Sequence, residues 1–268
     1  MVPESAHTTP VVLVAIPAGA IEMRDARSES SRHVALLPFE IGRTPVTRAE
    51  WDAVSADSVA AAGRALPHAS PRAPAHPVTW FEAVRWCNAA SAAAGLSPAY
   101  AISGREVEWR VDALGYRLPT EAEWELSCRA GTSGPTYGAL EDVAWTASDE
   151  VSGPREVGLK QANAFGLFDT IGNVWEWCWD YADTARYADY RSLRGGGWAD
   201  KAWSCRASVR RGSAPDAVLE DVGFRVACGP VGEANSHAAQ GWSREADRSR
   251  ADIRGAVPVG WTPLRETR

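Results

Sequence analysis

Polar residues that precede three apolar-rich stretches share one signature. At Thr47, Thr79 and Thr120, a threonine is followed three residues later by a glutamate. This is the pattern of a capping box, in which the hydroxyl and the carboxylate satisfy backbone N–H groups that the first helical turn leaves unpaired. The predicted helices cover residues 48–62, 80–94 and 121–130.

The other apolar residues fall in short runs that predict strands. Residues 11–16 and 34–41 predict an antiparallel pair near the start of the chain. Between residues 143 and 230, Gly, Asp, Asn and Trp interrupt every apolar period, so no long helix is predicted there. The sequence therefore predicts an α+β chain with much irregular structure. Further strand candidates are residues 191–194 and 223–227, with weaker signals at Trp145 and residues 155–159.

The composition changes near residue 231 and divides the chain into three parts. Residues 11–230 are expected to form one domain, preceded by an N-terminal tail of residues 1–10. After residue 230, Glu, Ser, Arg and Ala dominate without an apolar period. We therefore predict an extended or partly disordered C-terminal tail over residues 231–268, with Trp242 and Trp261 as docking anchors.

Composition and charge narrow the classes of protein. With 268 residues, 45% hydrophobic and 23% charged, the chain has globular values, and its 13 Trp predict a Trp-rich core. A net charge of −6 argues against a nucleic-acid or acidic-membrane partner. The five cysteines are scattered and form no CxxC pair, so they indicate neither a zinc site nor a disulfide framework. Without a basic leader or a long apolar run, a cytoplasmic protein is expected.

The segment GYRLPTEAEWELSCRA at residues 115–130 resembles the central motif of the formylglycine-generating enzyme family, also called the sulfatase-modifying-factor family. Other segments follow in the family's order, so the resemblance spans about residues 11–230. They are FEIGRTPVTRAEW, HPVTWFEAVRWCN, NAFGLFDTIGNVWEWCWD, LRGGGW, CRASVR and VGFRVA. The resemblance implies a C-type-lectin-like α+β fold with little regular secondary structure.

The family is functionally mixed, so the fold does not decide the function. It contains the copper-dependent oxidases that convert a sulfatase cysteine into formylglycine. It also contains domains of iron sulfoxide synthases, pyoverdine-maturation proteins, paralogues without known catalysis and ligand-binding variable proteins. The function must therefore be inferred from the residues that stand at the family's metal positions.

The family's oxidases hold Cu(I) with two cysteines that are separated by four residues and follow a Gly-Gly-Ser turn. In this sequence the turn is all glycine, the first copper cysteine falls at Asp200 and the second at Cys205. Cu(I) prefers soft thiolates to a hard carboxylate. The sequence therefore does not predict a standard copper formylglycine-generating oxidase.

Cys205 then has two interpretations. It is either a redox or metal-binding thiol paired with Asp200, or a small apolar filler beside Trp203. The first interpretation makes Cys205, Asp200, Trp198 and Trp203 the candidate catalytic residues, with iron or copper as the redox metal. The five histidines show no ligand spacing that would support such a metal.

A structural calcium site is also implied by the resemblance. In the family, one Ca²⁺ is held around the GNVWEW turn by a side-chain oxygen, two backbone carbonyls and a glutamate. These positions fall at Asp169, Gly172, Val174 and Glu176. Oxygen donors of this kind suit the hard Ca²⁺ ion. The alternative is that the two carboxylates only accept hydrogen bonds from the backbone of the turn.

Other residues of the motifs are interpreted first as structural. Buried guanidinium groups can tie irregular loops together, which we expect of Arg117, Arg194, Arg206 and Arg225. Trp124, Trp175, Trp177 and Trp198 are expected to form the packed centre, whereas Trp179 or Trp203 could line a ligand pocket.

Two functions follow from these residues. One is a metal-dependent oxidoreductase-like enzyme that acts on a small-molecule or peptide substrate. The other is a non-catalytic, calcium-stabilised, lectin-like module that binds a ligand or a partner. A homodimer, or a scaffold subunit that pairs with an active paralogue, fits the same residues.

Overall fold

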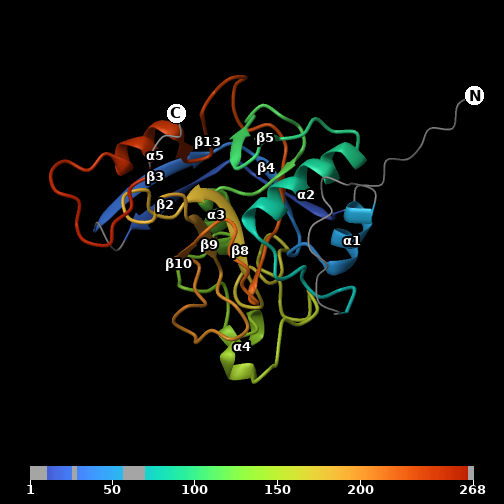
Figure 1. Cartoon of the computed structure of the whole chain (residues 1–268). Helices are drawn as coiled ribbons and strands as arrows, with labels where there is room; N and C mark the ends of the chain where they lie inside the picture. Colours follow the sequence, from blue (N-terminus) through green and yellow to red (C-terminus); the bar gives the residue numbers. More distant parts are fainter. Residues whose placement is uncertain (1–10, 26–28, 57–69, 265–268) are drawn as a thin grey trace, which may run out of the picture.

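The computed structural model describes residues 11–25, 29–56 and 70–264. It has five α-helices in this part of the chain and many short strands, so the predicted α+β class is confirmed (Figure 1). None of these helices is long and apolar enough to span a bilayer. The helices are α1 (Arg48–Ala56), α2 (Trp80–Ala93), α3 (Glu121–Arg129), α4 (Leu140–Val143) and α5 (Arg244–Ala251), with a 3₁₀ turn at Ala147–Asp149.

Capping boxes begin the first three helices, as the sequence predicted. The Thr79 hydroxyl accepts the backbone N–H of Glu82 at 3.1 Å, and the Glu82 carboxylate accepts the N–H of Thr79 at 2.8 Å. The same reciprocal pair begins α3 and α1. Helices α2 and α3 each end one residue before the predicted limit. The predicted continuation of α1, residues 57–62, lies outside the described residues.

Two four-stranded sheets organise the molecule, and three separate hairpins flank them. In Figure 1, α1 and α2 lie on one side, and the β2–β3 hairpin and α5 lie on the other, with β8 to β10 between them. The first sheet has the order β1 (Leu13–Ile16), β4 (Phe39–Gly42), β12 (Ala227–Cys228), β7 (Tyr116–Arg117). The second has the order β10 (Arg210–Ser213), β9 (Arg191–Arg194), β8 (Trp175–Tyr181), β11 (Val222–Gly223). The hairpins are β2 (Gly19–Asp25) with β3 (Ser30–Leu36), β5 (Tyr100–Ser103) with β6 (Glu106–Trp109), and β13 (Ala238–Ala239) with β14 (Trp242–Ser243).

The strand predictions are partly confirmed. Strand β1 pairs antiparallel with β4, and β9 has the predicted bounds. The predicted run over residues 34–41 is wrong as one strand, because Leu37 and Pro38 divide it between β3 and β4, which belong to different sheets. The run over residues 223–227 divides in the same way. The weaker candidates at Trp145 and residues 155–159 form no strand.

Tryptophan rings fill the centre of the molecule. The Trp51 and Trp86 rings stack with centroids 6.4 Å apart, and Trp179 contacts the rings of Trp80, Trp109 and Trp242. A buried indole N–H needs an acceptor, and irregular backbone supplies one. The Trp177 Nε1 group, for example, donates to the Val78 carbonyl at 2.7 Å. Of the tryptophans expected in the centre, Trp124, Trp175 and Trp177 are buried and Trp198 is half-buried.

Buried arginine–glutamate pairs hold the irregular segments, as predicted for three of the four arginines. Arg117 makes two hydrogen bonds with Glu123, at 2.6 and 2.7 Å. Arg194 contacts two glutamates of α3, and Arg225 pairs with Glu176. Such pairs fix geometry because each guanidinium presents several rigid donors. The prediction is wrong for Arg206, which is exposed and donates to the Trp203 carbonyl.

The C-terminal segment of residues 231–264 is not an extended or disordered tail. It forms β13, β14 and α5, and Trp242 is buried against Trp109 and Trp179. The side-chain amide of Gln240 donates to a Glu123 carboxylate oxygen at 3.0 Å and to the Leu37 carbonyl at 3.0 Å. The expected anchoring by Trp242 is confirmed, whereas the predicted tail is wrong because distant partners such as Trp109 and Glu123 order a segment that has no apolar period.

Candidate functional site

Cys205, the candidate catalytic thiol, is sealed in the interior. Its side chain is 0% exposed and packs in an apolar cluster with Trp124 and Cys128. The glycine turn covers it so closely that a Cβ at Gly196 would lie 2.8 Å from Sγ. Burial, and next the charge of Asp200, raise the pKa of the Cys205 thiol to about 12. Because the thiolate is the nucleophile and the metal ligand, this geometry supports the filler interpretation.

The Asp200 carboxylate and the Cys205 thiol have different hydrogen-bond partners. Its Oδ2 atom accepts the Trp175 Nε1–H at 2.6 Å and the Gly197 backbone N–H at 2.9 Å. The Cys205 Sγ atom instead faces the backbone carbonyls of Gly197 and Asp200, at 3.9 and 4.0 Å. In the described ranges, no three His, Cys, Asp or Glu side chains are grouped so that they could hold a metal ion. No hydrogen bond joins the Asp200 carboxylate to the Cys205 thiol, and a metal site at this pair stays a prediction.

The two other candidate residues, Trp198 and Trp203, differ in exposure. Trp203 is 66% exposed, so it is available to a ligand. Trp198 is half-buried, and its backbone N–H donates to the Asn173 carbonyl at 2.9 Å. Trp179, the other tryptophan considered for a pocket, is buried in the core.

An open groove of about 680 Å³ lies beside Asp200 and Trp203. Two of its rings, Tyr187 and Tyr190, stack with centroids 5.3 Å apart. Neither tyrosine could be singled out from the sequence, because both fall between the family motifs in a segment without periodicity. This aromatic groove is lined by Trp175, Tyr187, Tyr190, Asp200, Trp203, Ser204, Val209, Arg210, Arg211 and Gly212.

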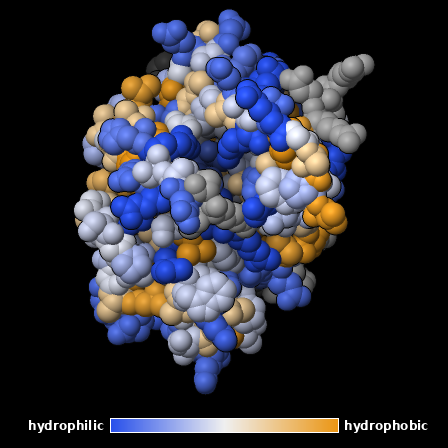
Figure 2. All heavy atoms as spheres, turned by 90° about the vertical axis from the view of Figure 1, so that its left-hand side faces the viewer, coloured by the Kyte–Doolittle hydropathy of each residue, from blue (hydrophilic) through white to orange (hydrophobic). Residues whose placement is uncertain are grey.

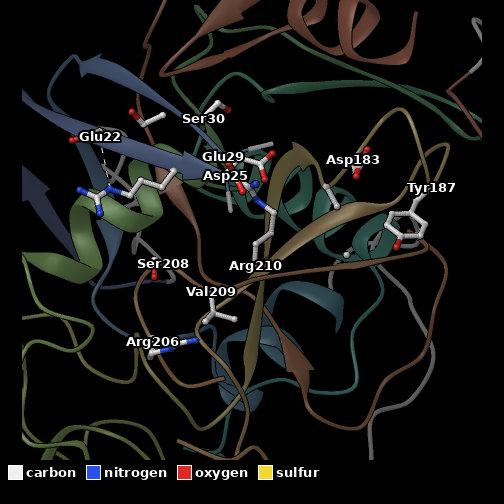
Figure 3. A pocket seen from close by; sticks show the side chains of 14 residues that line it. Glu22, Asp25, Glu29, Ser30, Asp183, Tyr187, Arg206, Ser208, Val209 and Arg210 are labelled. Atoms are coloured by element: carbon white, nitrogen blue, oxygen red, sulfur yellow. Dashed lines mark ion pairs between the residues drawn. The ribbon is translucent and has the colours of Figure 1, made fainter. Parts of the chain in front are cut away.

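A second groove of about 650 Å³ opens on the face that carries the β2–β3 hairpin, which is mostly polar (Figure 2). Figure 3 shows Arg210 directed toward Asp25 and Glu29 at the end of the hairpin, with Asp183 on the far side. This charged groove contains side chains of both signs. It shares four lining residues with the aromatic groove, so the two adjoin at the edge strand β10: Tyr187, Val209, Arg210 and Gly212.

The positions implied for calcium lie on the turn before β8 and, for Glu176, at the second residue of β8, but their carboxylates have protein partners. Glu176 is buried, and its two oxygens accept from Arg225 at 2.6 and 2.7 Å; Trp124 Nε1 donates to one of them at 2.7 Å. Asp169 Oδ2 accepts the Gly158 N–H at 2.7 Å. Glu176 therefore does not fit as a calcium ligand in this arrangement, because the Arg225 guanidinium already neutralises its charge and binds both of its oxygens. Calcium at Asp169, Gly172, Val174 and Glu176 stays a prediction.

A buried carboxyl on β8 gives the stability of the protein a pH dependence. Asp180 accepts the Glu121 backbone N–H at 2.9 Å, and burial, followed by the charge of Glu121, raises the pKa of Asp180 from 3.8 to about 7. The folded state then keeps a proton that the unfolded state releases. This stabilisation is complete below about pH 4 and is lost as the pH rises through about 7.

We expect Asp180→Asn to flatten this dependence. Between pH 4 and 7, removal of one proton difference changes the slope by about 1.4 kcal/mol per pH unit. Urea denaturation at several pH values measures it. Parallel curves for the variant and the wild type would contradict this assignment.

A family model described as "Sulfatase-modifying factor enzyme 1-like domain" matches residues 1–229. The chain belongs to this family. The segment after residue 229 lies outside the matched domain.

The relatives of this sulfatase-modifying-factor domain differ in what they are named for. Chaperone protein LppX of Paenibacillus barcinonensis is 28% identical over 253 residues, which cover 80% of this chain and 88% of LppX. The formylglycine-generating enzyme of Streptomyces coelicolor is 28% identical over 276 residues, with coverage of 80% and 88%. The solved structure of Treponema denticola variable protein 1 is 30% identical with a TM-score of 0.70, and the match covers 81% of this chain and 95% of that one.

Proposed function

We propose that this protein is a ligand- or partner-binding member of the family rather than a metal-dependent oxidoreductase. The observation that carries the proposal is the burial of Cys205 together with the engagement of the Asp200 carboxylate by Trp175. An oxidase of the family's type needs a soft, accessible donor pair. Here one donor is a carboxylate and the other is a sealed, protonated thiol.

The adjoining grooves support binding. The aromatic groove offers Trp203 and the stacked tyrosines, whose faces suit the apolar or planar part of a small molecule or a peptide. The charged groove offers carboxylates and arginines to polar groups of the same ligand. A relative that is named a chaperone agrees with a binding role.

Anaerobic loading with Cu(I) or Fe(II), followed by metal analysis and oxygen uptake with a thiol peptide, tests the catalytic side of the proposal. We expect no oxygen uptake, and equal metal content in the wild type and in Cys205→Ala. Stoichiometric metal that is lost in Cys205→Ala, together with oxygen consumption, would instead establish the oxidoreductase.

A thermal-shift screen of small molecules and peptides tests the binding side. A ligand of the aromatic groove should raise the melting temperature of the wild type and have little effect on Trp203→Ala. Val259→Ala is the matched control, because Val259 is an exposed apolar residue that lines neither groove. A ligand whose effect survives in Trp203→Ala binds elsewhere and counts against this groove.

A further inference from the structure

One segment supplies the wall that the two grooves share. Residues 182–190, here termed the wall loop, connect β8 to β9. Asp183 lines the charged groove, Tyr190 lines the aromatic groove, and Tyr187 lines both. The position of this loop therefore sets the width of both grooves at once.

The wall loop pairs with a short stretch near the C-terminus. Thr262 donates its backbone N–H and its hydroxyl to the Arg186 carbonyl, each at 2.9 Å, and its carbonyl accepts the Ala188 N–H at 2.6 Å. The Leu264 N–H donates to the Thr184 carbonyl at 2.7 Å. Tyr187 and Thr262 thus form a parallel β-bridge, so the loop backbone is bonded on the side of residues 262–264.

Side chains add to this pairing. The Arg186 guanidinium lies 4.6 Å from the centre of the Trp261 ring, a cation–π distance. The Thr184 hydroxyl donates to the Asp247 carbonyl of α5 at 2.9 Å. The carboxylate of Asp247 accepts the Nε1–H of the buried Trp242 at 2.8 Å. The loop is therefore connected through α5 to the tryptophan core.

The chain between α5 and this pairing is mostly exposed. Between Asp252 and Gly260, Ile253 is half-buried and every other residue is exposed. Few contacts hold such a stretch, so the pairing at residues 261–264 can open without unfolding the core. Local opening of this kind would release the wall loop and leave β8 and β9 in place.

We propose that residues 261–264 act as a clamp that positions the wall loop, so that the shape of both grooves depends on a segment outside the matched family domain. The biological role of the clamp rests on the proposed binding function. Whether residues 261–264 hold the wall loop in place does not depend on that function. Trp261 and Thr262 are its positioning residues.

Hydrogen exchange measured by mass spectrometry on the full chain tests the clamp without any ligand. In Thr262→Pro, which removes the N–H donor, and in Trp261→Ala, we expect exchange in residues 183–190 to accelerate at least about tenfold. The Ala188 amide, which donates to Thr262, reports most directly. Peptides from α2 and β8 should keep the wild-type rate. Thr262→Ser, which keeps both donors, should restore slow exchange in the loop.

Each outcome decides the matter. Unchanged exchange of residues 183–190 in both variants would overturn the clamp, whether or not the grooves bind a ligand. Accelerated exchange across the whole molecule would also overturn it, because the segment would then be a general stabiliser. Val257→Ala, an exposed position between α5 and the clamp, should leave every peptide unchanged. A screen that finds no groove ligand would count against the proposed function alone.

Discussion

Glu176→Gln is expected to lower the free energy of unfolding by about 3–5 kcal/mol, because it leaves the buried Arg225 guanidinium without its counter-charge. Both side chains are fully buried, and two hydrogen bonds join them. Glutamine keeps the size of the side chain but replaces one accepting oxygen by an NH2 group, so the loss combines the missing charge with one lost acceptor. Urea denaturation measures the difference, with one series in EDTA and one with added Ca²⁺.

The two series separate the ion pair from the implied calcium site. If Arg225 is the counter-ion of Glu176, the variant loses the same stability in both conditions. A loss confined to the series with Ca²⁺ would assign Glu176 to the metal and contradict the ion-pair explanation. Asp216→Asn is the matched control, since Asp216 pairs with Arg105 at 2.9 Å on the exposed surface. Its removal should cost less than about 1 kcal/mol.

Local chemistry made part of the fold predictable from the sequence. A capping box needs only two residues three positions apart, so the starts of α1, α2 and α3 follow from the chain alone. The division of residues 34–41 between two sheets does not, because it depends on which strands lie beside β4. The same holds for residues 231–264, whose order comes from distant partners such as Glu123.

The candidate site shows the same limit. The family resemblance pointed to Asp200 and Cys205, and Sγ does lie near the Asp200 backbone carbonyl, at 4.0 Å. The direction of each side chain was not predictable, because it depends on Trp175 and on how closely the glycine turn packs. Likewise, the motif around Glu176 could not show that Arg225, 49 residues away in sequence, would hold its carboxylate.

Gly172→Ala adds only one methyl group, but we expect it to lower the free energy of unfolding substantially. Gly172 has φ +73°, and an added Cβ would lie 2.3 Å from the Trp145 carbonyl oxygen and 2.9 Å from its nitrogen. That backbone cannot move away easily, because the same Trp145 carbonyl accepts the Asn173 N–H at 2.9 Å. The left-handed conformation costs alanine about 1–2 kcal/mol. The clash adds to this, and we expect a total loss of at least about 3 kcal/mol.

Gly166→Ala is the matched control for the steric part of this cost. Gly166 has φ +81°, but nothing lies within 4 Å of an added Cβ. It should therefore lose only the conformational part, about 1–2 kcal/mol. Urea midpoints of the two variants, or soluble yield if Gly172→Ala does not fold, measure the difference. Equal losses would mean that the turn before β8 relaxes around the new methyl group. In that case, close packing against Trp145 would not be the reason that glycine stands at this position.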